Sequence, residues 1–462
     1  MLDSPLQAFR SSLRGQVITA QDADYDVARS VWNGEINRRP AVIARCADAA
    51  DVAAAIVFAR AQSLEISVRG GGHNFSGAAV ADGALMIDLS LLRQVHVDPE
   101  ARTARCGGGA TVADVDTATQ ARGLAVTLGT ISHTGVAGLT LGGGFGWLTN
   151  KMGLSCDNLV SAEVVLAEGR VVRASESEHP DLFWALRGGG GNFGVVTEFE
   201  YRLQPVGPMI HLGMLFWEQA RSAEALRVAR DAIQALPREA GGLLAAGLCA
   251  PPEPFVPAQH HFAAGSALLI AGFGSAEEHA ALVESARAAL PPLFEFVSPI
   301  PYAGLQQMLD ASAPWGVHAY EKGLHLDEMS DEAIATLAEY LPAKKSPLSF
   351  LPIFPLGGAY ADVAEDATAF GGSRSARWVV NVGAISPDPA VLAEDRVWAR
   401  ELWAALCPYA SNTGGYINFM AEYEADRVRT AYGPAKYERL SKIKTQYDPD
   451  NVFHLNANIP PG

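Results

Sequence analysis

The chain has 462 residues, of which 49% are hydrophobic and 19% are charged, a composition typical of a folded protein with room for two domains or more. Its formal net charge of −16 at pH 7 repels nucleic-acid phosphates and anionic membranes. Because of this charge we expect no nucleic-acid partner. The chain contains no run of about 18 apolar residues, so we expect no membrane span either.

The N-terminal stretch MLDSPLQAFRSSLRGQV lacks the apolar segment that a signal peptide needs, which favours a cytoplasmic protein. The cysteines are odd in number, widely spaced and without a C-x-x-C pair: Cys46, Cys106, Cys156, Cys249 and Cys407. This pattern predicts neither a disulfide framework nor a zinc site, and it fits a reducing compartment.

Up to about residue 206, short apolar or β-branched runs alternate with glycine clusters. Strands are predicted at 41–46, 65–70, 84–90, 95–98 and 194–203, with a hairpin over 162–175. Helices are predicted at 48–64, 111–123 and 179–188.

After residue 206 the glycine clusters become sparse and longer helical patterns appear. Helices are predicted at 218–236, 275–290 and 330–341, and strands at 266–274, 346–354 and 376–385. This alternation predicts an α+β unit in which helices back an antiparallel sheet. The tail from about residue 414 is rich in asparagine and is expected to be an ordered extension.

Four glycine clusters occupy residues 69–73 (RGGGH), 106–109 (CGGG), 141–146 (LGGGFG) and 187–194 (RGGGGNFG). A backbone without side chains lets N–H groups converge on an anion, and a pyrophosphate is the usual one. None of the four has the spacing of a Rossmann motif between a strand and a helix. A dinucleotide, if bound, is therefore expected in a different fold.

Four longer segments carry a family resemblance: SVRGGGHNFSG, TGVAGLTLGGGFGWLTNKMGLSCDNL, DLFWALRGGGGNFGVVTEF and YDPDNVFHLNANIPP. Together they closely resemble the berberine-bridge-enzyme-like flavoprotein oxidases of the vanillyl-alcohol-oxidase superfamily, which have a PCMH-type FAD-binding domain. The resemblance extends from about residue 20 to the C-terminus. It is strongest to the bacterial 6-hydroxy-D-nicotine oxidase branch and to polyketide-tailoring members, which suggests secondary metabolism.

The resemblance implies an α+β fold in four parts. Residues 1–37 would pack on a PCMH-type FAD-binding domain of two α+β subdomains at 38–207. Residues 208–410 would form a substrate domain with an antiparallel sheet backed by helices. Residues 411–462 would return to the FAD domain.

In this family the histidine of RGGGH is bonded to the 8α carbon of the flavin, which implies covalent attachment at His73. A neutral imidazole suits this role because it is a good nucleophile. The alternative is a loop histidine with a structural hydrogen bond. Members with a second link use a cysteine where this chain has Ile131, so we expect FAD with a single attachment. Cys156 is expected to be a small buried residue.

The resemblance also implies the remaining FAD contacts: Arg69, Gly70, Gly71, Gly72, Asn74, Gly129, Thr130, Ser132, His133, Thr134, Gly135, Gly138, Leu139, Gly142, Gly194, Val196, Asn456 and Asn458. Of these, His133 would shape where O₂ meets the ring, or would merely pack in its loop. Asn456 and Asn458 would touch the flavin from the substrate side. No metal is expected.

Tyr416 and Asn418 match a Tyr-x-Asn element at the family's active site. If the segment is extended, a spacing of two places both side chains on one face. A tyrosine there would donate a proton to, or accept one from, a substrate hydroxyl or amine. The alternative is a buried strand tyrosine whose hydroxyl is already satisfied.

Two segments depart from the family. The run LPIFPLGGA at 351–359 lacks the polar or acidic residue that many relatives carry, and ATAFGGSR at 367–374 lacks a histidine. We therefore expect a substrate wall without an acid, with proton handling mainly by Tyr416. Tyr302, Tyr320 and Lys322 are the next candidates.

The function that the resemblance implies is an FAD-dependent oxidase. A small-molecule substrate would give hydride to flavin N5 from a C–H next to oxygen or nitrogen, and O₂ would reoxidise the flavin to yield H₂O₂. The alternatives are a flavin-dependent oxygenase acting on a polyketide-like substrate and, more remotely, a non-catalytic flavin-binding protein. The chain is expected to be a monomer or a homodimer.

Overall fold

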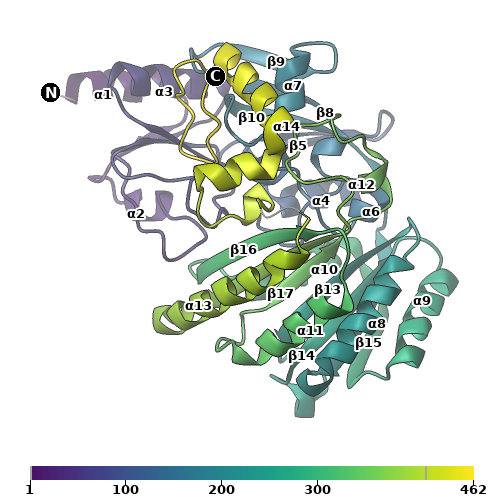
Figure 1. Cartoon of the computed structure of the whole chain (residues 1–462). Coiled ribbons are helices and arrows are strands. Elements are labelled where there is room, and N and C mark those ends of the chain that lie inside the picture. Colours follow the sequence, from purple (N-terminus) through teal and green to yellow (C-terminus); the bar gives the residue numbers. More distant parts are fainter. Residues whose placement is uncertain (1–2, 412–413) are drawn as a thin grey trace.

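The computed structural model describes residues 3–411 and 414–462. In Figure 1 the N-terminal part and the C-terminal segment form the upper half, and a large sheet with its helices forms the lower half. Within the described residues the strands form sheets of four, five, two and seven strands.

The first sheet has the order β1-β2-β4-β3 and is mostly parallel. Its strands are β1 (Gln16–Ile18), β2 (Val42–Arg45), β3 (Ile66–Arg69) and β4 (Leu85–Asp88). Helix α3 (Ala49–Ala61) makes the crossover between β2 and β3, and α1 (Asp3–Ser12) packs on it through Phe9 and Phe58. Because β3 ends at Arg69, the first glycine cluster begins at the carboxyl end of a buried strand.

The second sheet is antiparallel and has the order β5-β6-β10-β8-β9. Its strands are β5 (Val95–Asp98), β6 (Thr103–Gly107), β8 (Leu159–Val165), β9 (Val171–Ser175) and β10 (Val195–Arg202). The helices around it are α4 (Val112–Gln120), α5 (Val136–Leu141), α6 (Thr149–Met152) and α7 (Pro180–Leu186). A short ribbon pairs β7 (Leu124–Ala125) with β11 (Gln204–Pro205).

The third sheet is antiparallel and has the order β15-β12-β14-β13-β17-β18-β16. Its strands are β12 (Met209–Glu218), β13 (Ala240–Cys249), β14 (Ala264–Gly272), β15 (Phe294–Pro301), β16 (His318–Leu326), β17 (Leu351–Pro355) and β18 (Trp378–Ser386). The helices α8 (Ser222–Gln234), α9 (Ala276–Ala289), α11 (Asp331–Tyr340) and α13 (Pro389–Leu406) cover one face of it (Figure 1). Three short α-helices complete the described α-helices up to residue 411: α2 (Tyr25–Ala28), α10 (Tyr302–Gln307) and α12 (Ala359–Asp362).

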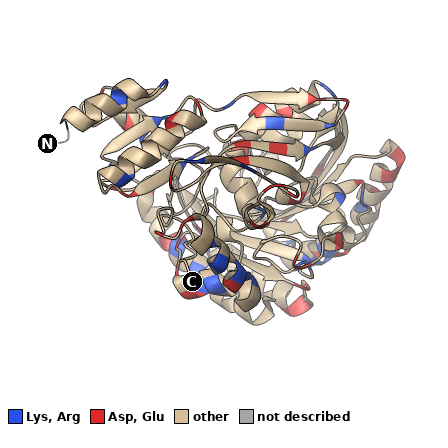
Figure 2. Ribbon diagram, turned by 90° about the horizontal axis from the view of Figure 1, so that it is seen from above, with Lys and Arg blue, Asp and Glu red and all other residues tan. Residues whose placement is uncertain are grey.

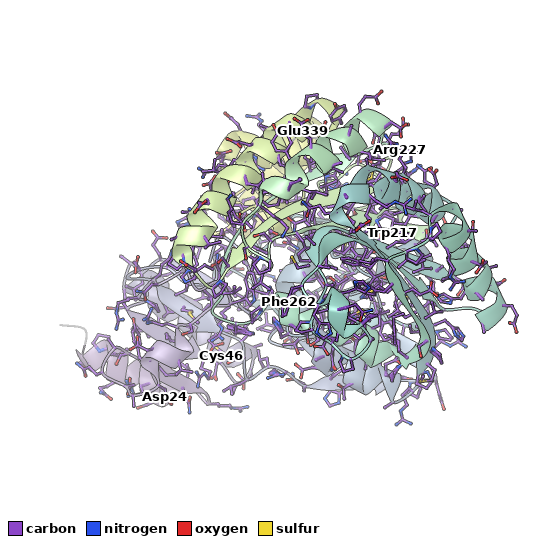
Figure 3. All side chains as sticks on the ribbon, turned by 90° about the horizontal axis from the view of Figure 1, so that it is seen from below. Asp24, Cys46, Trp217, Arg227, Phe262 and Glu339 are labelled. Carbon is purple, nitrogen blue, oxygen red and sulfur yellow. The ribbon has the colours of Figure 1, made fainter. Side chains whose placement is uncertain are left out.

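Successive side chains of this large sheet point to opposite faces, because a strand has a period of two residues. Leu215 and Trp217 pack in the core beneath the helices, whereas Met214 and Phe216 pack in the core shared with the second sheet. Figure 3 shows Trp217 on the sheet and Arg227 on the helical layer. The face that turns away from the helices therefore forms a wall against the FAD-binding part.

The large sheet is also where the predicted elements depart most from the structure. The strand predicted at 346–354 begins only at Leu351. No strand was predicted at the positions of β12, β13, β15 and β16. Strand β13 is rich in glycine and alanine, and β16 reads HAYEKGLHL, whose charged and polar residues are unusual in a buried strand.

The C-terminal helix α14 (Ala425–Tyr447) bends at Gly433, which has a φ of 71° and precedes Pro434. Near its end, the fully buried Lys444 ammonium donates to Asp448 Oδ2 at 2.6 Å, to the Asn192 carbonyl at 2.7 Å and to the Phe453 carbonyl at 3.0 Å. Asn192 belongs to the fourth glycine cluster. One buried cation thus ties the tail to that cluster, while the domain boundaries at 37/38, 207/208 and 410/411 stay predictions.

Charged side chains of both signs share the same elements, and Figure 2 shows Lys and Arg gathered on the helix next to the C-terminus. Over residues 3–411 and 414–462, no helix combines the length and the apolar character that crossing a membrane requires.

The Lys444 contact gives a stability prediction. Lys444→Met keeps the aliphatic stem but leaves Asp448 buried without a cation, so we expect the free energy of unfolding to fall by about 3–5 kcal/mol in urea denaturation. The control Lys442→Met removes an exposed partner of Glu438 and is expected to change the free energy of unfolding by about 0.5 kcal/mol at most. Equal effects of the two changes would contradict a structural role for the buried pair.

Candidate active site

A cavity of about 350 Å³ lies between loops of the four- and five-stranded sheets and the face of the seven-stranded sheet that is not covered by helices. This volume is within the range of small-molecule sites. The glycine loop after β3, the loop over 129–139, the fourth glycine cluster and the tail all contribute to its lining, together with β16 and β18. Several of the segments that were predicted to bind FAD are thus brought together around one space.

The four glycine clusters do not all line this cavity. Glycines of the first and fourth clusters line it, whereas those of the second and third do not. A Cβ at Gly109 would lie 1.8 Å from the Leu89 carbonyl oxygen, and one at Gly142 would lie 2.3 Å from Asn418 Oδ1. The second and third clusters therefore serve close packing of the backbone, which corrects the expectation of four anion-binding loops.

Two glycines hold the walls of the cavity together. A Cβ on Gly71 would lie 2.3 Å from Gly135 N, and a Cβ on Gly135 would lie 2.3 Å from Gly71 N. Real Cβ atoms do not approach that closely, so any other residue would push the two loops apart. Next to this contact, a Cβ at Gly138 would meet no atom within 4 Å, so that the bare backbone there borders the open space.

His73 lies at the end of the first loop and borders the cavity. Its ring stacks on Trp32 with centroids 4.5 Å apart, and its Nε2 lies 3.1 Å from His133 Nδ1. Burial, followed by the neighbouring His133, lowers the pKa of His73 to about 3. The imidazole is therefore neutral at neutral pH, which is the nucleophilic form.

Tyr416 and Asn418 meet, although not through the expected extended segment, because residues Ile417–Phe419 form a 3₁₀ turn. The Tyr416 hydroxyl oxygen accepts hydrogen bonds from Gly144 N at 2.9 Å and from Asn418 Nδ2 at 2.8 Å. Burial raises the pKa of Tyr416, so its phenol keeps its proton. An oxygen that already accepts two bonds has only its own hydrogen to offer, so Tyr416 is placed as a donor.

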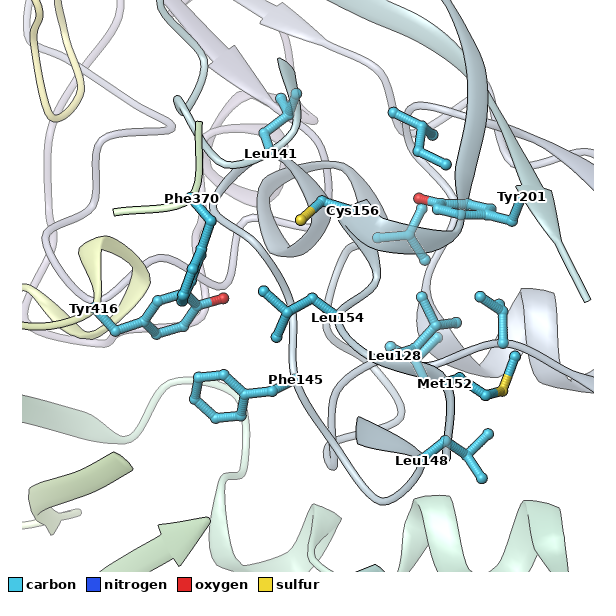
Figure 4. Packing of buried hydrophobic residues seen from close by; sticks show 14 of the residues in the cluster. Leu128, Leu141, Phe145, Leu148, Met152, Leu154, Cys156, Tyr201, Phe370 and Tyr416 are labelled. Carbon is cyan, nitrogen blue, oxygen red and sulfur yellow. The ribbon is translucent and has the colours of Figure 1, made fainter. Parts of the chain in front are cut away.

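Aromatic packing fixes the Tyr416 ring. Phe145 lies 4.7 Å and Phe370 6.2 Å from it between ring centroids, and both stand beside it in Figure 4. Phe419 packs edge-on at 5.1 Å. The ring therefore has little freedom to turn its hydroxyl away from the Gly144 loop.

The structure places most of the predicted site residues on the cavity wall. Those that line it are His73, Tyr416, Asn418, Gly70, Gly71, Gly72, Asn74, Gly129, Thr130, Thr134, Gly135, Gly138, Leu139, Gly194, Val196 and Asn456. Those that lie outside the lining are Arg69, Ser132, His133, Gly142 and Asn458. Arg69 donates to the Ala28 carbonyl, and Ser132 binds the Asp310 carboxylate through N and Oγ at 2.7 and 2.5 Å. His133 contacts His73, which does line the cavity.

The expectation of a substrate wall without an acid is wrong. Strand β17 and the residue before it contribute only Phe350, Pro352 and Phe354 to the lining, as the sequence indicated, but Glu321 on β16 also lines the cavity. Asn381 Nδ2 on β18 donates to Glu321 Oε2 at 2.7 Å. Burial raises the pKa of Glu321 well above its usual range. A buried carboxyl that faces a cavity is a candidate for acid–base work.

The three residues named as next candidates do not line this space. Tyr320 and Lys322 flank Glu321 and point to the helical face, where Arg400 donates to Tyr320 Oη at 3.0 Å and Lys322 Nζ lies 4.6 Å from the Trp403 ring centre. Tyr302 is buried in α10. The two-residue period of β16 thus separates the acid from both of its neighbours.

Cys156 is a small buried residue, as the sequence predicted, and Ile131 lines the cavity. Cys156 is fully buried in a 3₁₀ turn away from the lining, and burial raises its pKa. Its thiol is therefore an unreactive packing group.

Residues 40–175 match the family model of the FAD binding domain, and residues 415–460 match the model described as berberine and berberine like. The chain is 32% identical over 460 residues to the (R)-6-hydroxynicotine oxidase of Paenarthrobacter nicotinovorans, with 97% of each chain covered. The chain belongs to the berberine-bridge-enzyme-like family of FAD-linked oxidases. It is therefore an enzyme, and its relatives support FAD-dependent oxidase activity.

Solved structures of the family confirm the predicted α+β fold. The 6-hydroxy-D-nicotine oxidase of Arthrobacter nicotinovorans matches with a TM-score of 0.86 at 29% identity, over 98% of this chain and 99% of that one. The glucooligosaccharide oxidase of Acremonium strictum has the same fold, with a TM-score of 0.85 at 24% identity over 99% of this chain and 100% of that one. Its FAD is described as carrying 6-S-cysteinyl and 8α-N1-histidyl links.

The residues of this chain fit the FAD of the family. The glycine backbones of 70–72, 138 and 190–191 border the cavity without side chains, as close approach of a pyrophosphate requires. At the fourth cluster, Asn456 Oδ1 is buried without a hydrogen-bond partner within the described part of the chain. Such an orphaned acceptor is expected to meet a donor of the bound cofactor.

The close contact between Gly71 and Gly135 predicts that a side chain at Gly71 lowers both FAD binding and stability. Gly71→Ala should lower the FAD content of the purified protein and reduce the free energy of unfolding by about 1–3 kcal/mol, because the new methyl overlaps the opposite backbone. The ratio of flavin to protein absorbance and urea denaturation measure the two effects. Gly304→Ala is the control, since its nearest neighbour is Pro301 Cδ at 3.8 Å. Full FAD content in Gly71→Ala would contradict the proposal that these glycine loops bind FAD.

Proposed function

We propose that the protein oxidises a small organic molecule at a C–H next to oxygen or nitrogen, with FAD joined covalently to His73 and O₂ as the final electron acceptor. The observation that carries this proposal is a neutral imidazole at the rim of a glycine-lined cavity, in a chain of the FAD-linked oxidase family. FAD would supply the redox chemistry by taking hydride at N5 and passing two electrons to O₂, which leaves as H₂O₂.

His73 would act through the nitrogen that His133 leaves free. Its Nε2 contacts His133 Nδ1, so an Nε2–H donated to His133 leaves a lone pair on Nδ1 for the flavin 8α carbon. Burial lowers the pKa of His133 too, so this ring is also neutral and accepts the hydrogen bond. Stacking on Trp32 holds the His73 plane in place.

Tyr416 would donate its hydrogen bond to the substrate or to its oxidised product. Gly144 and Asn418 hold the oxygen, and the ring is packed on several sides. Asn418 is itself oriented by contacts of 3.2 Å from its Nδ2 to the carbonyls of Gly138 and Leu139. These contacts support a positioned hydrogen-bond donor rather than a base.

Several finer assignments stay predictions. They are the single attachment, O₂ as oxidant, the FAD contacts beyond the cavity lining, a cytoplasmic location, a role in secondary metabolism, and a monomeric or homodimeric state. The aromatic residues Phe350, Phe354 and Phe419 of the lining suit an aromatic, polyketide-like substrate, so a flavin-dependent oxygenase that acts on such a substrate is the second candidate. Stoichiometric release of H₂O₂ distinguishes the oxidase, because an oxygenase incorporates the oxygen into its product.

Covalent attachment gives the first test. The flavin should stay with acid-precipitated wild-type protein and should be released from His73→Ala. Peptide mapping should find one flavin-bearing peptide, which contains His73, and an unmodified Cys156. A yellow pellet of the His73→Ala variant, or a flavin thioether at any cysteine, would overturn the assignment.

The role of Tyr416 is tested by separating the two half-reactions. Tyr416→Phe should slow anaerobic flavin reduction by about 10²–10⁴-fold, the usual span for one acid–base group, and should leave reoxidation by O₂ nearly unchanged. Stopped-flow absorbance measures each half-reaction. Tyr437→Phe is a matched control because Tyr437 lies on α14 and does not line the cavity. Unchanged reduction in Tyr416→Phe would make this residue structural.

A further inference from the structure

Glu321 and Asn381 leave two acceptor atoms free at the same place. The pair shares one hydrogen bond, from Asn381 Nδ2 to Glu321 Oε2. Glu321 Oε1 and Asn381 Oδ1 are buried and have no hydrogen-bond partner among the described residues. Glu321 is 0% exposed and Asn381 6% exposed, and both line the cavity. A buried acceptor without a partner is rare in folded proteins and calls for a donor.

The surroundings of the pair are short of positive charge. No Lys or Arg occurs among the described residues that line the cavity, and Glu321 is their single carboxyl group. The other titratable groups of the lining are His73, which is neutral, and the phenols Tyr416 and Tyr423. After burial, the charge of Glu321 is among the influences that raise the pKa of both phenols. A carboxylate here therefore has no counter-ion from the chain and is costly to ionise.

The rest of this wall is apolar. Phe350, Pro352, Phe354, Ile385 and Phe419 line the cavity with β16 and β18. A sugar would bury several hydroxyl groups against these side chains, and each unpaired polar group costs about 1–3 kcal/mol. An alcohol has a single O–H, so it would satisfy only one of the two acceptors of an ionised Glu321–Asn381 pair, and it would leave the carboxylate without a counter-ion. A primary or secondary ammonium group has at least two N–H donors and a positive charge, and its substituents would match the apolar wall.

We propose that Glu321 and Asn381 form the subsite for the amino group of an apolar primary or secondary amine substrate. One N–H would donate to Glu321 Oε1 and another to Asn381 Oδ1. This inference rests on the proposed function, which supplies the hydride acceptor, and it assigns the substrate class and the proton acceptor. The acid on β16 takes the place of the polar group that β17 lacks.

The subsite also accounts for the proton that oxidation of an amine must lose. The ammonium N–H bond breaks, its proton passes to Glu321 Oε1, and the electron pair stays on nitrogen as a lone pair. Bound FAD would then supply the acceptor for the hydride of the adjacent C–H bond, and the nitrogen lone pair would form the C=N bond of an iminium product. Burial favours the protonated form of Glu321, so the carboxyl group holds the proton once the positive charge has left the nitrogen.

The test uses two probes of equal shape that have no oxidisable C–H next to the heteroatom: 2-phenylpropan-2-amine and 2-phenylpropan-2-ol. Titration calorimetry of the holoenzyme near pH 8 measures both dissociation constants without reading the flavin. We expect the amine to bind at least about tenfold more tightly than the alcohol. Glu321→Gln should weaken amine binding by about 100-fold and alcohol binding by less than threefold.

Two more variants test the second acceptor and provide a control. Asn381→Leu should weaken amine binding by about tenfold, since it removes one neutral acceptor. Glu422→Gln, which changes an exposed carboxylate paired with Arg400, should leave both constants unchanged. With pH, amine affinity should rise as Glu321 loses its proton and fall again as the free amine loses its own. The rising limb should vanish in Glu321→Gln.

The outcomes separate this inference from the proposed function. Equal binding of amine and alcohol, or a Glu321→Gln effect of the same size on both, overturns the amine subsite even if the flavin is fully and covalently bound. Release of the flavin on acid treatment of the wild type overturns the attachment at His73 but leaves the calorimetric comparison valid. An amine preference that disappears only in the Glu321 and Asn381 variants supports the inference.

Discussion

Burial of titratable side chains around one cavity is the constraint that sets the chemistry of this protein. Burial disfavours the charged form of every titratable group. It lowers the pKa of His73 to about 3 and raises the pKa of Tyr416 and Glu321. At neutral pH the same burial therefore provides a nucleophilic imidazole and a phenol that donates a hydrogen bond. It also favours the protonated form of the Glu321 carboxyl group.

The enclosure depends on how closely backbones approach one another. Gly71 and Gly135 bring two loops together, and the glycines of the third cluster let Asn418 and Phe370 lie directly on the chain. The buried Lys444 then ties the tail to the fourth cluster. Glycine thus has two separate roles here, since some glycines border the cofactor cavity and others close it by packing.

The sequence predicted one side of the cavity well. The motifs around His73, Gly129–Gly138 and Tyr416 are local, and each places its residues through a short loop whose conformation glycine permits. The other side was predicted less well, because it depends on the pairing of strands that are distant in sequence. Glu321 was overlooked because HAYEKGLHL reads as a polar segment until its position inside a seven-stranded sheet is known. Trp32, which stacks on His73, comes from a segment expected only to pack on the domain.

A crystal structure of the flavin-loaded protein tests the central claim most directly. We predict an FAD with its pyrophosphate along the backbones of 70–72 and 138, continuous electron density between the His73 imidazole and the 8α carbon, and an isoalloxazine ring with Tyr416 and Glu321 both facing the space beside N5. A flavin ring away from His73, or a Glu321 side chain separated from that space by protein, would contradict the account.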